Sequence, residues 1–269
     1  MNNKPIGVFD TGAGGLSLVR ELRRLMPNEN IIYLCDTARA PYGGHSKELI
    51  ASNTMQGLEF LQEHEVKLLI CASGTAAAVL PEASVKRLSV PYISGLMPCA
   101  QEACAVSVHG TIGVIGSAAT VHSLAFGRAI RNIRTDARVI GKACPLLVTM
   151  SENGMTDPKD LLLKLAIKTY LEPLLREGID ALILGSSHYS VLFSAISEVF
   201  DYGVTLIDSA HVTAKYIESY LMQNNLQNDE AGGVSHWLVT DAPQSLAELS
   251  KIYYGEEIRE AIKEVKLGN

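Results

Sequence analysis

The sequence has 269 residues, of which 47% are hydrophobic and 19% are charged, and its formal net charge is −6. This length supplies a core for one large or two medium domains, while the acidic balance and low aromatic content argue against nucleic acid as a main partner. No apolar run reaches the roughly 18 residues that suggest a membrane span, and the N-terminal residues MNNKPIGVFD contain no secretory signal. We therefore expect a cytoplasmic protein that has neither a membrane nor a nucleic acid as its partner.

Short apolar runs alternate along the chain with longer segments of helical period, which is typical of buried parallel strands joined by helical crossovers. In chain order, the predicted strands are residues 6–9, 31–34, 68–71, 92–94, 112–115, 137–140, 182–184 and 204–207. The predicted helices include residues 16–25, 46–63, 123–132, 158–177 and 209–223. This alternation predicts an α/β fold.

The segments that follow five of these strands are rich in small and polar residues. They read DTGAGG at 10–15, DTARAPYGG at 36–44, ASGTAAA at 72–78, GSAAT at 116–120 and GSSHY at 185–189. Ligands of open parallel sheets gather at the carboxyl ends of the strands. Because the five turns come from both halves of the chain, we expect one cleft lined from two sides.

Two of these turns have a structural and a functional interpretation that the sequence leaves open. The glycines after Asp10 and Thr11 allow backbone amides to approach an anion, but either side chain also suits a simple helix cap. The spacing is not that of a dinucleotide-binding GxGxxG motif. Likewise, Ser73, Gly74 and Thr75 suit either the binding of a carboxylate or the capping of the next helix.

His188 and Glu152 are candidate acid or base groups. His188 stands in GSSHY, where it could act as an acid, a base or a hydrogen-bond donor, although a single histidine also serves structure alone. Ser186 beside it suggests a serine nucleophile, but the GxSxG elbow is missing and the order of residues defines no triad. Glu152 is expected in a loop after the apolar run ACPLLV, where the simpler interpretation is a solvated turn.

The five cysteines, Cys35, Cys71, Cys99, Cys104 and Cys144, are scattered without CxxC spacing. Their odd number and spacing argue against disulfides and against a structural zinc site. We expect them to be small buried residues, and we expect no metal site.

The strand-end segments together resemble the glutamate racemase family over nearly the whole chain. The family reads roughly FDSGVGGL, YLGDTARxPYG, ACNTATA, a VPVIG segment leading into EP, GTxxT, CPxxVxxxENG, LGCTHYP and DSA. In the same order, this chain reads FDTGAGGL (9–16), YLCDTARAPYGG (33–44), ASGTAAA (72–78), VPYISGLMP (90–98), GSAAT (116–120), CPLLVTMSENG (144–154), LGSSHYS (184–190) and DSA (208–210). No single string is decisive, but eight in order make a chance resemblance very improbable.

The resemblance implies two α/β lobes, each a doubly wound parallel sheet, with the ligand cleft between them. Lobe one would combine residues 1–95 with 211–269, and lobe two would be residues 96–210. The implied activity is a cofactor-independent isomerisation of L- and D-glutamate for peptidoglycan of the cell wall, in which two cysteines on opposite faces of the substrate's Cα exchange its proton. Homodimers are common in the family, so a homodimer is also an expectation.

The resemblance assigns roles to fourteen positions of this sequence. The catalytic positions are Asp10, Ser73, Glu152, Ser186 and His188. The positions that bind a small acidic amino acid or dicarboxylate are Thr11, Pro41, Tyr42, Gly43, Gly74, Thr75, Ser117, Thr120 and Ser187.

The departures from the family pattern bear directly on the chemistry. Serine stands at both thiol positions, 73 and 186, and Gly74 replaces a neighbouring asparagine. A thiol has a pKa of about 8.5 that its surroundings can lower, whereas an alcohol needs an adjacent base to lose its proton. The further changes at Gly74, Ser187 and Ser190 favour natural divergence over a laboratory exchange of the two thiols.

Three functions remain open from the sequence. The first, which is favoured because the loss of both thiols argues against ordinary two-thiol racemisation, is altered acid–base chemistry, of lyase or hydrolase type, carried by Asp10, Glu152 and His188. The second is a non-catalytic binding or regulatory protein that keeps the pocket. The third is a glutamate racemase that acts through an arrangement not evident from the residues.

Overall fold

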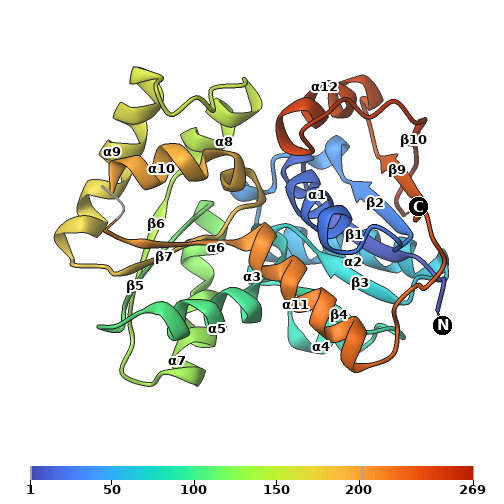
Figure 1. Ribbon diagram of the computed structural model, residues 1–269, viewed down its shortest axis with the longest axis horizontal. Coiled ribbons are helices and arrows are strands. Elements are labelled where there is room, and N and C mark those ends of the chain that lie inside the picture. Colours follow the sequence, from blue (N-terminus) through green and yellow to red (C-terminus); the bar gives the residue numbers. More distant parts are fainter. Residues whose placement is uncertain (1, 201–202, 269) are drawn as a thin grey trace.

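The computed structural model describes residues 2–200 and 203–268, which build two parallel β-sheets side by side (Figure 1). Sheet A has the strand order β10-β9-β2-β1-β3-β4, and sheet B has the order β6-β5-β7-β8. The strands of sheet A are β1 (Ile6–Asp10), β2 (Ile31–Cys35), β3 (Leu68–Cys71), β4 (Tyr92–Ser94), β9 (Ser235–Val239) and β10 (Ile262–Glu264). Those of sheet B are β5 (Thr111–Gly116), β6 (Arg138–Ala143), β7 (Ala181–Leu184) and β8 (Thr205–Asp208).

The α/β class and the two parallel-sheet lobes are confirmed, and each of the eight predicted strands has a counterpart among β1–β8. The strands could be predicted because buried strands appear in the sequence as short apolar runs. Strands β1, β2, β3 and β7 are buried along their whole length. Strands β9 and β10 were not predicted. The lobe boundaries after residues 95 and 210 stay a prediction.

Helices fill the connections between the strands. The long ones are α1 (Leu16–Leu25), α2 (Lys47–Glu63), α5 (Leu96–Val106), α7 (Ala125–Ile133), α8 (Pro145–Glu152), α9 (Leu161–Arg176), α11 (Ser209–Gln223) and α12 (Pro243–Tyr253). The short ones are α3 (Gly74–Val79), α4 (Glu82–Val85), α6 (Ala118–Ser123) and α10 (Phe193–Val199), with 3-10 turns η1 (Ala13–Gly15), η2 (Thr37–Arg39), η3 (Tyr42–Gly44) and η4 (Ser187–Leu192). Helices α1 and α11 have the predicted bounds, whereas α8 overturns the loop expected around Glu152.

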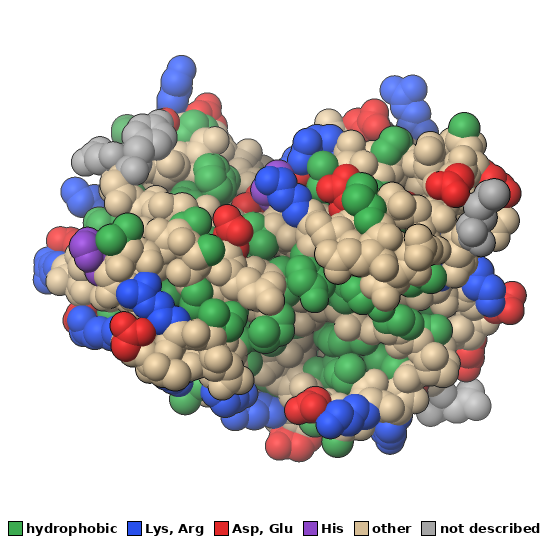
Figure 2. Space-filling model, turned by 60° about the horizontal axis from the view of Figure 1, so that its bottom comes forward, with side chains coloured by type: hydrophobic (Ala, Val, Ile, Leu, Met, Phe, Trp, Pro, Cys, Tyr) green, Lys and Arg blue, Asp and Glu red, His purple; other side chains and the backbone are tan. Residues whose placement is uncertain are grey.

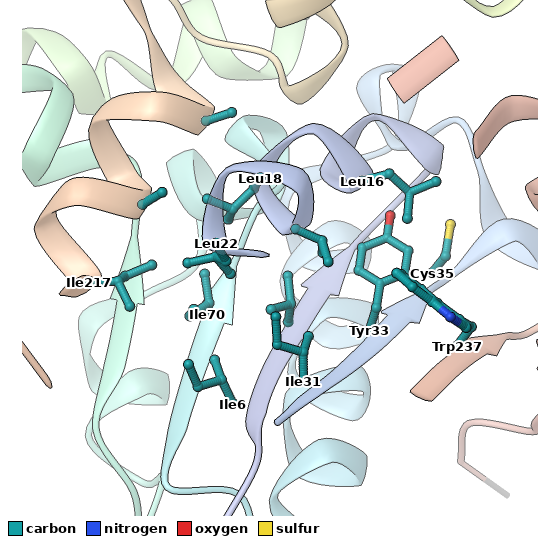
Figure 3. Packing of buried hydrophobic residues seen from close by; sticks show 14 of the residues in the cluster. Ile6, Leu16, Leu18, Leu22, Ile31, Tyr33, Cys35, Ile70, Ile217 and Trp237 are labelled. Carbon is teal, nitrogen blue, oxygen red and sulfur yellow. The ribbon is translucent and has the colours of Figure 1, made fainter. Parts of the chain in front are cut away.

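Apolar side chains between the helices and sheet A form one of the cores (Figure 3). Leu18 and Leu22 of α1 meet Ile70 of β3 and Ile217 of α11 there. On the other side, the Tyr33 ring packs edge-on against Trp237 of β9 at 6.1 Å between centroids. Burial of such side chains stabilises the fold by about 25 cal/mol for each Å² of apolar surface removed from water. The contact of Tyr33 with Trp237 therefore helps to hold β9 in the sheet.

The chain crosses from sheet A to sheet B after β4 and returns to sheet A after β8. Within each sheet, strands are added on both sides of a central pair. In sheet A the order reverses between β1 and β3, and in sheet B between β5 and β7. Such reversals open a crevice at the carboxyl ends of the strands. Figure 2 shows that hydrophobic side chains gather in the hollow between the two halves, while charged ones lie around its rim. None of the described helices combines the length and apolar character that a membrane crossing needs.

Candidate functional site

A cavity of about 450 Å³ lies where the two crevices face each other. Its wall contains residues from the turns that follow β1, β2 and β3 of sheet A and β5 and β7 of sheet B, together with one face of α8. This volume is in the range of small-molecule sites. A larger hollow of about 780 Å³ lies away from these turns, beside α5 and α11.

Twelve of the fourteen predicted site residues line this cavity. They are Thr11, Pro41, Tyr42, Gly43, Ser73, Gly74, Thr75, Ser117, Glu152, Ser186, Ser187 and His188. The two exceptions, Asp10 and Thr120, lie behind the wall: Asp10 is fully buried, and Thr120 bonds to the Ser117 hydroxyl at 3.0 Å. The site roles proposed for all fourteen stay predictions, but the cleft between the halves brings them together.

Asp10 has the contacts of a structural cap. Its carboxylate accepts the Thr11 N–H at 2.7 Å and the Gly15 N–H, so it orders the turn between β1 and α1. It also accepts the Ser187 hydroxyl at 3.0 Å across the cleft. Asp10 therefore ties the two halves together just below the cavity.

Ser73 and Ser186, which the family resemblance places at the thiol positions, have no basic partner among the described residues. The Ser73 hydroxyl bonds to Thr11 Oγ1 at 3.0 Å and accepts the Ala76 N–H at 3.3 Å, which caps α3. Within the described part of the chain, the Ser186 side chain forms no hydrogen bond. An activated serine needs a base within about 2.6–3.2 Å, and neither serine has one among the residues that the structure describes.

None of the five cysteines lies on the described wall of the cavity. Burial raises the pKa of Cys71 and of Cys144 to about 12, and it raises the pKa of Cys35 well above its ordinary value. These thiols stay protonated near neutral pH. The expectation that they are small buried residues is met by four of them, and Cys104 is half-buried.

His188 and Glu152 form an ion-pair geometry on the cavity wall. His188 Nε2 lies 3.1 Å from Glu152 Oε1. The histidine side chain is 10% exposed and the glutamate 41%, so the pair faces the cavity and meets solvent on one side. This pair can donate or accept a proton at the ligand.

The expected loop around Glu152 is instead the end of α8, which begins with Pro145 at a first-turn position that favours helix formation. Pro145, Val148, Thr149 and Glu152 line the cavity. Their spacing of three and four residues places them on one helix face. The first three were not predicted, although this spacing is visible in the sequence. The other unpredicted lining residues, Gly12, Ala40, Gly44 and Ala118, adjoin predicted ones.

Hydroxyl groups connect the two halves at the cavity wall. Thr75 Oγ1 of the sheet-A half lies 2.8 Å from Ser117 Oγ of the sheet-B half. Gly74, next to Thr75, meets Gly185 backbone to backbone: a Cβ at residue 74 would lie 2.0 Å from the Gly185 carbonyl oxygen. The two halves are therefore in direct contact around the cavity.

Two departures from the family pattern have hydrogen-bond partners. Ser190 donates to Asp208 Oδ1 at 2.6 Å, and this carboxylate caps α11. Ser187 donates to Asp10. These serines are integrated into their surroundings.

A pH-dependent effect is expected at Asp10, because burial raises the pKa of its carboxyl. The folded protein then binds this proton more tightly than the unfolded chain, so the contribution of Asp10 to stability falls as pH rises above about 3.8. We expect the unfolding free energy of the wild type, minus that of Asp10→Asn, to fall as the pH is raised from about 3.8 to the higher pKa of Asp10 in the folded protein. Denaturant unfolding of both proteins at a series of pH values measures it, and a difference that grows with pH would contradict the expectation.

Comparison with known proteins shows the family to which the chain belongs. The Asp/Glu/Hydantoin racemase family matches residues 6–217. A glutamate racemase of Geobacter metallireducens is 36% identical over 256 residues, covering 95% of this chain and 94% of the relative. One from Syntrophus aciditrophicus is 39% identical and covers 94% of each chain.

Solved structures extend the match to the whole fold. A glutamate racemase isoform of Bacillus anthracis superposes with a TM-score of 0.93 at 34% identity, covering 99% of both chains. The glutamate racemase of Francisella tularensis, solved in complex with D-glutamate, gives a TM-score of 0.91 at 32% identity, covering 99% of this chain and 98% of the other. The chain therefore belongs to the Asp/Glu/hydantoin racemase family and is similar to its glutamate racemases.

Proposed function

We propose that this protein binds a small acidic amino acid of the size of glutamate in the cavity between its sheets, without interconverting the enantiomers at the pace of a two-thiol enzyme. The observation that supports the proposal is which residues line the cavity and which are absent from its described wall. Serines stand at the two thiol positions, neither has a base beside it among the described residues, and no cysteine lines the described wall. A ligand can be held there, but its Cα proton meets no thiolate.

Support for the ligand class comes from the site and from a relative. The Francisella tularensis racemase is described in complex with D-glutamate. In this chain the cavity has the hydroxyls of Thr75 and Ser117 and the turn at Gly43 on its wall. Hydroxyl and amide donors suit the carboxylates of an acidic amino acid.

Calorimetric titration with L-glutamate, D-glutamate, L-aspartate and D-aspartate tests the binding. We expect saturable heat with at least one glutamate enantiomer. The variant Ser186→Phe, whose ring would fill the cavity, should abolish that heat while it remains folded by circular dichroism. Absence of heat with all four amino acids would contradict the proposal.

A second candidate function is altered acid–base chemistry of lyase or hydrolase type, which the His188–Glu152 pair at the cavity favours. If a dicarboxylate or amino-acid derivative is turned over, His188→Gln and Glu152→Gln should each abolish the turnover. Undiminished turnover in both variants would remove this candidate. A cytoplasmic location and a homodimer stay predictions.

A further inference from the structure

Tyr253 brings the C-terminal part of the chain to the candidate site. It is the last residue of α12 and lies beyond the residues 6–217 that match the family. Its side chain is fully buried (0% exposed). Although α12 belongs to the sheet-A half, this side chain contacts Ser151 and His188, which are both in the sheet-B half.

The hydroxyl of Tyr253 holds the end of α8. Ser151 Oγ lies 2.8 Å from Tyr253 Oη and donates its own proton to the carbonyl oxygen of Val148 at 2.8 Å. Because a serine hydroxyl has only one proton, Tyr253 must be the donor to Ser151. Ser151 is fully buried and directly precedes Glu152, so this bond fixes the backbone that carries the glutamate.

The ring of Tyr253 contacts His188, the other member of the His188–Glu152 pair. It packs edge-on against the imidazole of His188, with centroids 5.3 Å apart and planes at 82°, an arrangement that aromatic rings favour. On another side the imidazole meets the turn after β1, where a Cβ at Gly14 would lie 2.6 Å from His188 Nδ1. The imidazole is thus confined between this turn and Tyr253, with Nε2 directed to Glu152.

We propose that Tyr253 is a positioning residue that sets the geometry of the His188–Glu152 pair from the C-terminal helix α12. The proposal rests on the proposed function of the cavity as a ligand site and adds a residue that acts through the pair and not on the ligand. Removal of the hydroxyl alone should loosen Glu152 relative to His188 while the ring stays in place.

The test compares Tyr253→Phe with Tyr254→Phe, a neighbouring tyrosine whose ring packs on Trp237 at 5.3 Å between centroids. Protein labelled with ¹⁵N-histidine reports the Nε2 resonance of His188 without ligand, assigned through its loss in His188→Gln. In Tyr253→Phe this resonance should move toward its position in Glu152→Gln, and the affinity for the bound glutamate enantiomer should fall roughly 3- to 10-fold, the worth of one hydrogen bond. Tyr254→Phe should change neither.

Ser151→Ala removes the acceptor of the same hydrogen bond and should reproduce the resonance shift, so it decides the question if Tyr253→Phe does not fold. An unmoved resonance in the folded variants, or an equal shift in Tyr254→Phe, would overturn the proposal. If the wild type binds neither glutamate enantiomer, the proposed function fails, and the resonance of the unliganded protein still decides the role of Tyr253.

Discussion

Replacing both Ser73 and Ser186 with cysteine is expected to raise the rate of α-proton exchange in glutamate by roughly 10²- to 10⁴-fold, the usual contribution of one positioned proton-transfer group. Both serines line the cavity, so new thiols would face it from the two positions that the family resemblance assigns to the thiols. A thiol with an ordinary pKa of about 8.5 reaches the thiolate form near neutral pH when its surroundings lower that pKa. Proton NMR in D₂O, following the α-proton of L- and D-glutamate, measures the exchange.

The single variants serve as controls for this gain. With only Ser73→Cys or only Ser186→Cys, one face of the ligand meets a thiol, so each variant should exchange the α-proton of one enantiomer in preference to the other. If the double variant binds glutamate and exchanges no faster than the wild type, the serines are not what limits the chemistry.

Gly74→Ala is expected to lower the free energy of unfolding by about 1–3 kcal/mol, the usual cost of inserting a group into a packed interior. The new Cβ would lie 2.0 Å from the carbonyl oxygen of Gly185. The obstacle is backbone and not a flexible side chain, so the two turns must move apart. Denaturant unfolding of both proteins measures the loss.

Gly44→Ala is the matched control for stability, because a Cβ at residue 44 meets no atom of the described residues within 4 Å. Its unfolding free energy should stay within about 0.5 kcal/mol of the wild type. Equal stability of Gly74→Ala and the wild type would contradict the close approach of the two halves at this point.

Much of the fold was predictable because parallel strands buried on both faces appear as short apolar runs. Strand β9 reads SHWLV and begins with a half-buried serine and an exposed histidine, and β10 reads IKE and is mostly exposed at the sheet edge. The apolar run of β9 is only three residues long, Trp237–Val239, and β10 has no such run. Their places depend on packing between residues far apart in sequence, such as Tyr33 with Trp237.

The residues of the cavity wall that follow directly after strands could be predicted from the sequence. Those whose positions depend on tertiary contacts could not. The order of the polar turns, with the family resemblance, located most of the cavity wall. Whether Asp10 would face the cavity or cap its own turn depended on hydrogen bonds to Gly15 and Ser187. Tyr253 lies 65 residues after His188 (253 − 188), and no local pattern connects it with the site.

The most direct measurement is the NMR of the unmodified protein with L-glutamate and with D-glutamate in D₂O. Ser73 and Ser186 have no adjacent base in the described part of the chain, and an alcohol alone cannot take a proton from an unactivated carbon at a useful rate. The α-proton signals should therefore persist, and neither enantiomer should appear from the other. Loss of these signals at a pace typical of enzymes, about 1–10³ s⁻¹, would contradict the proposed function.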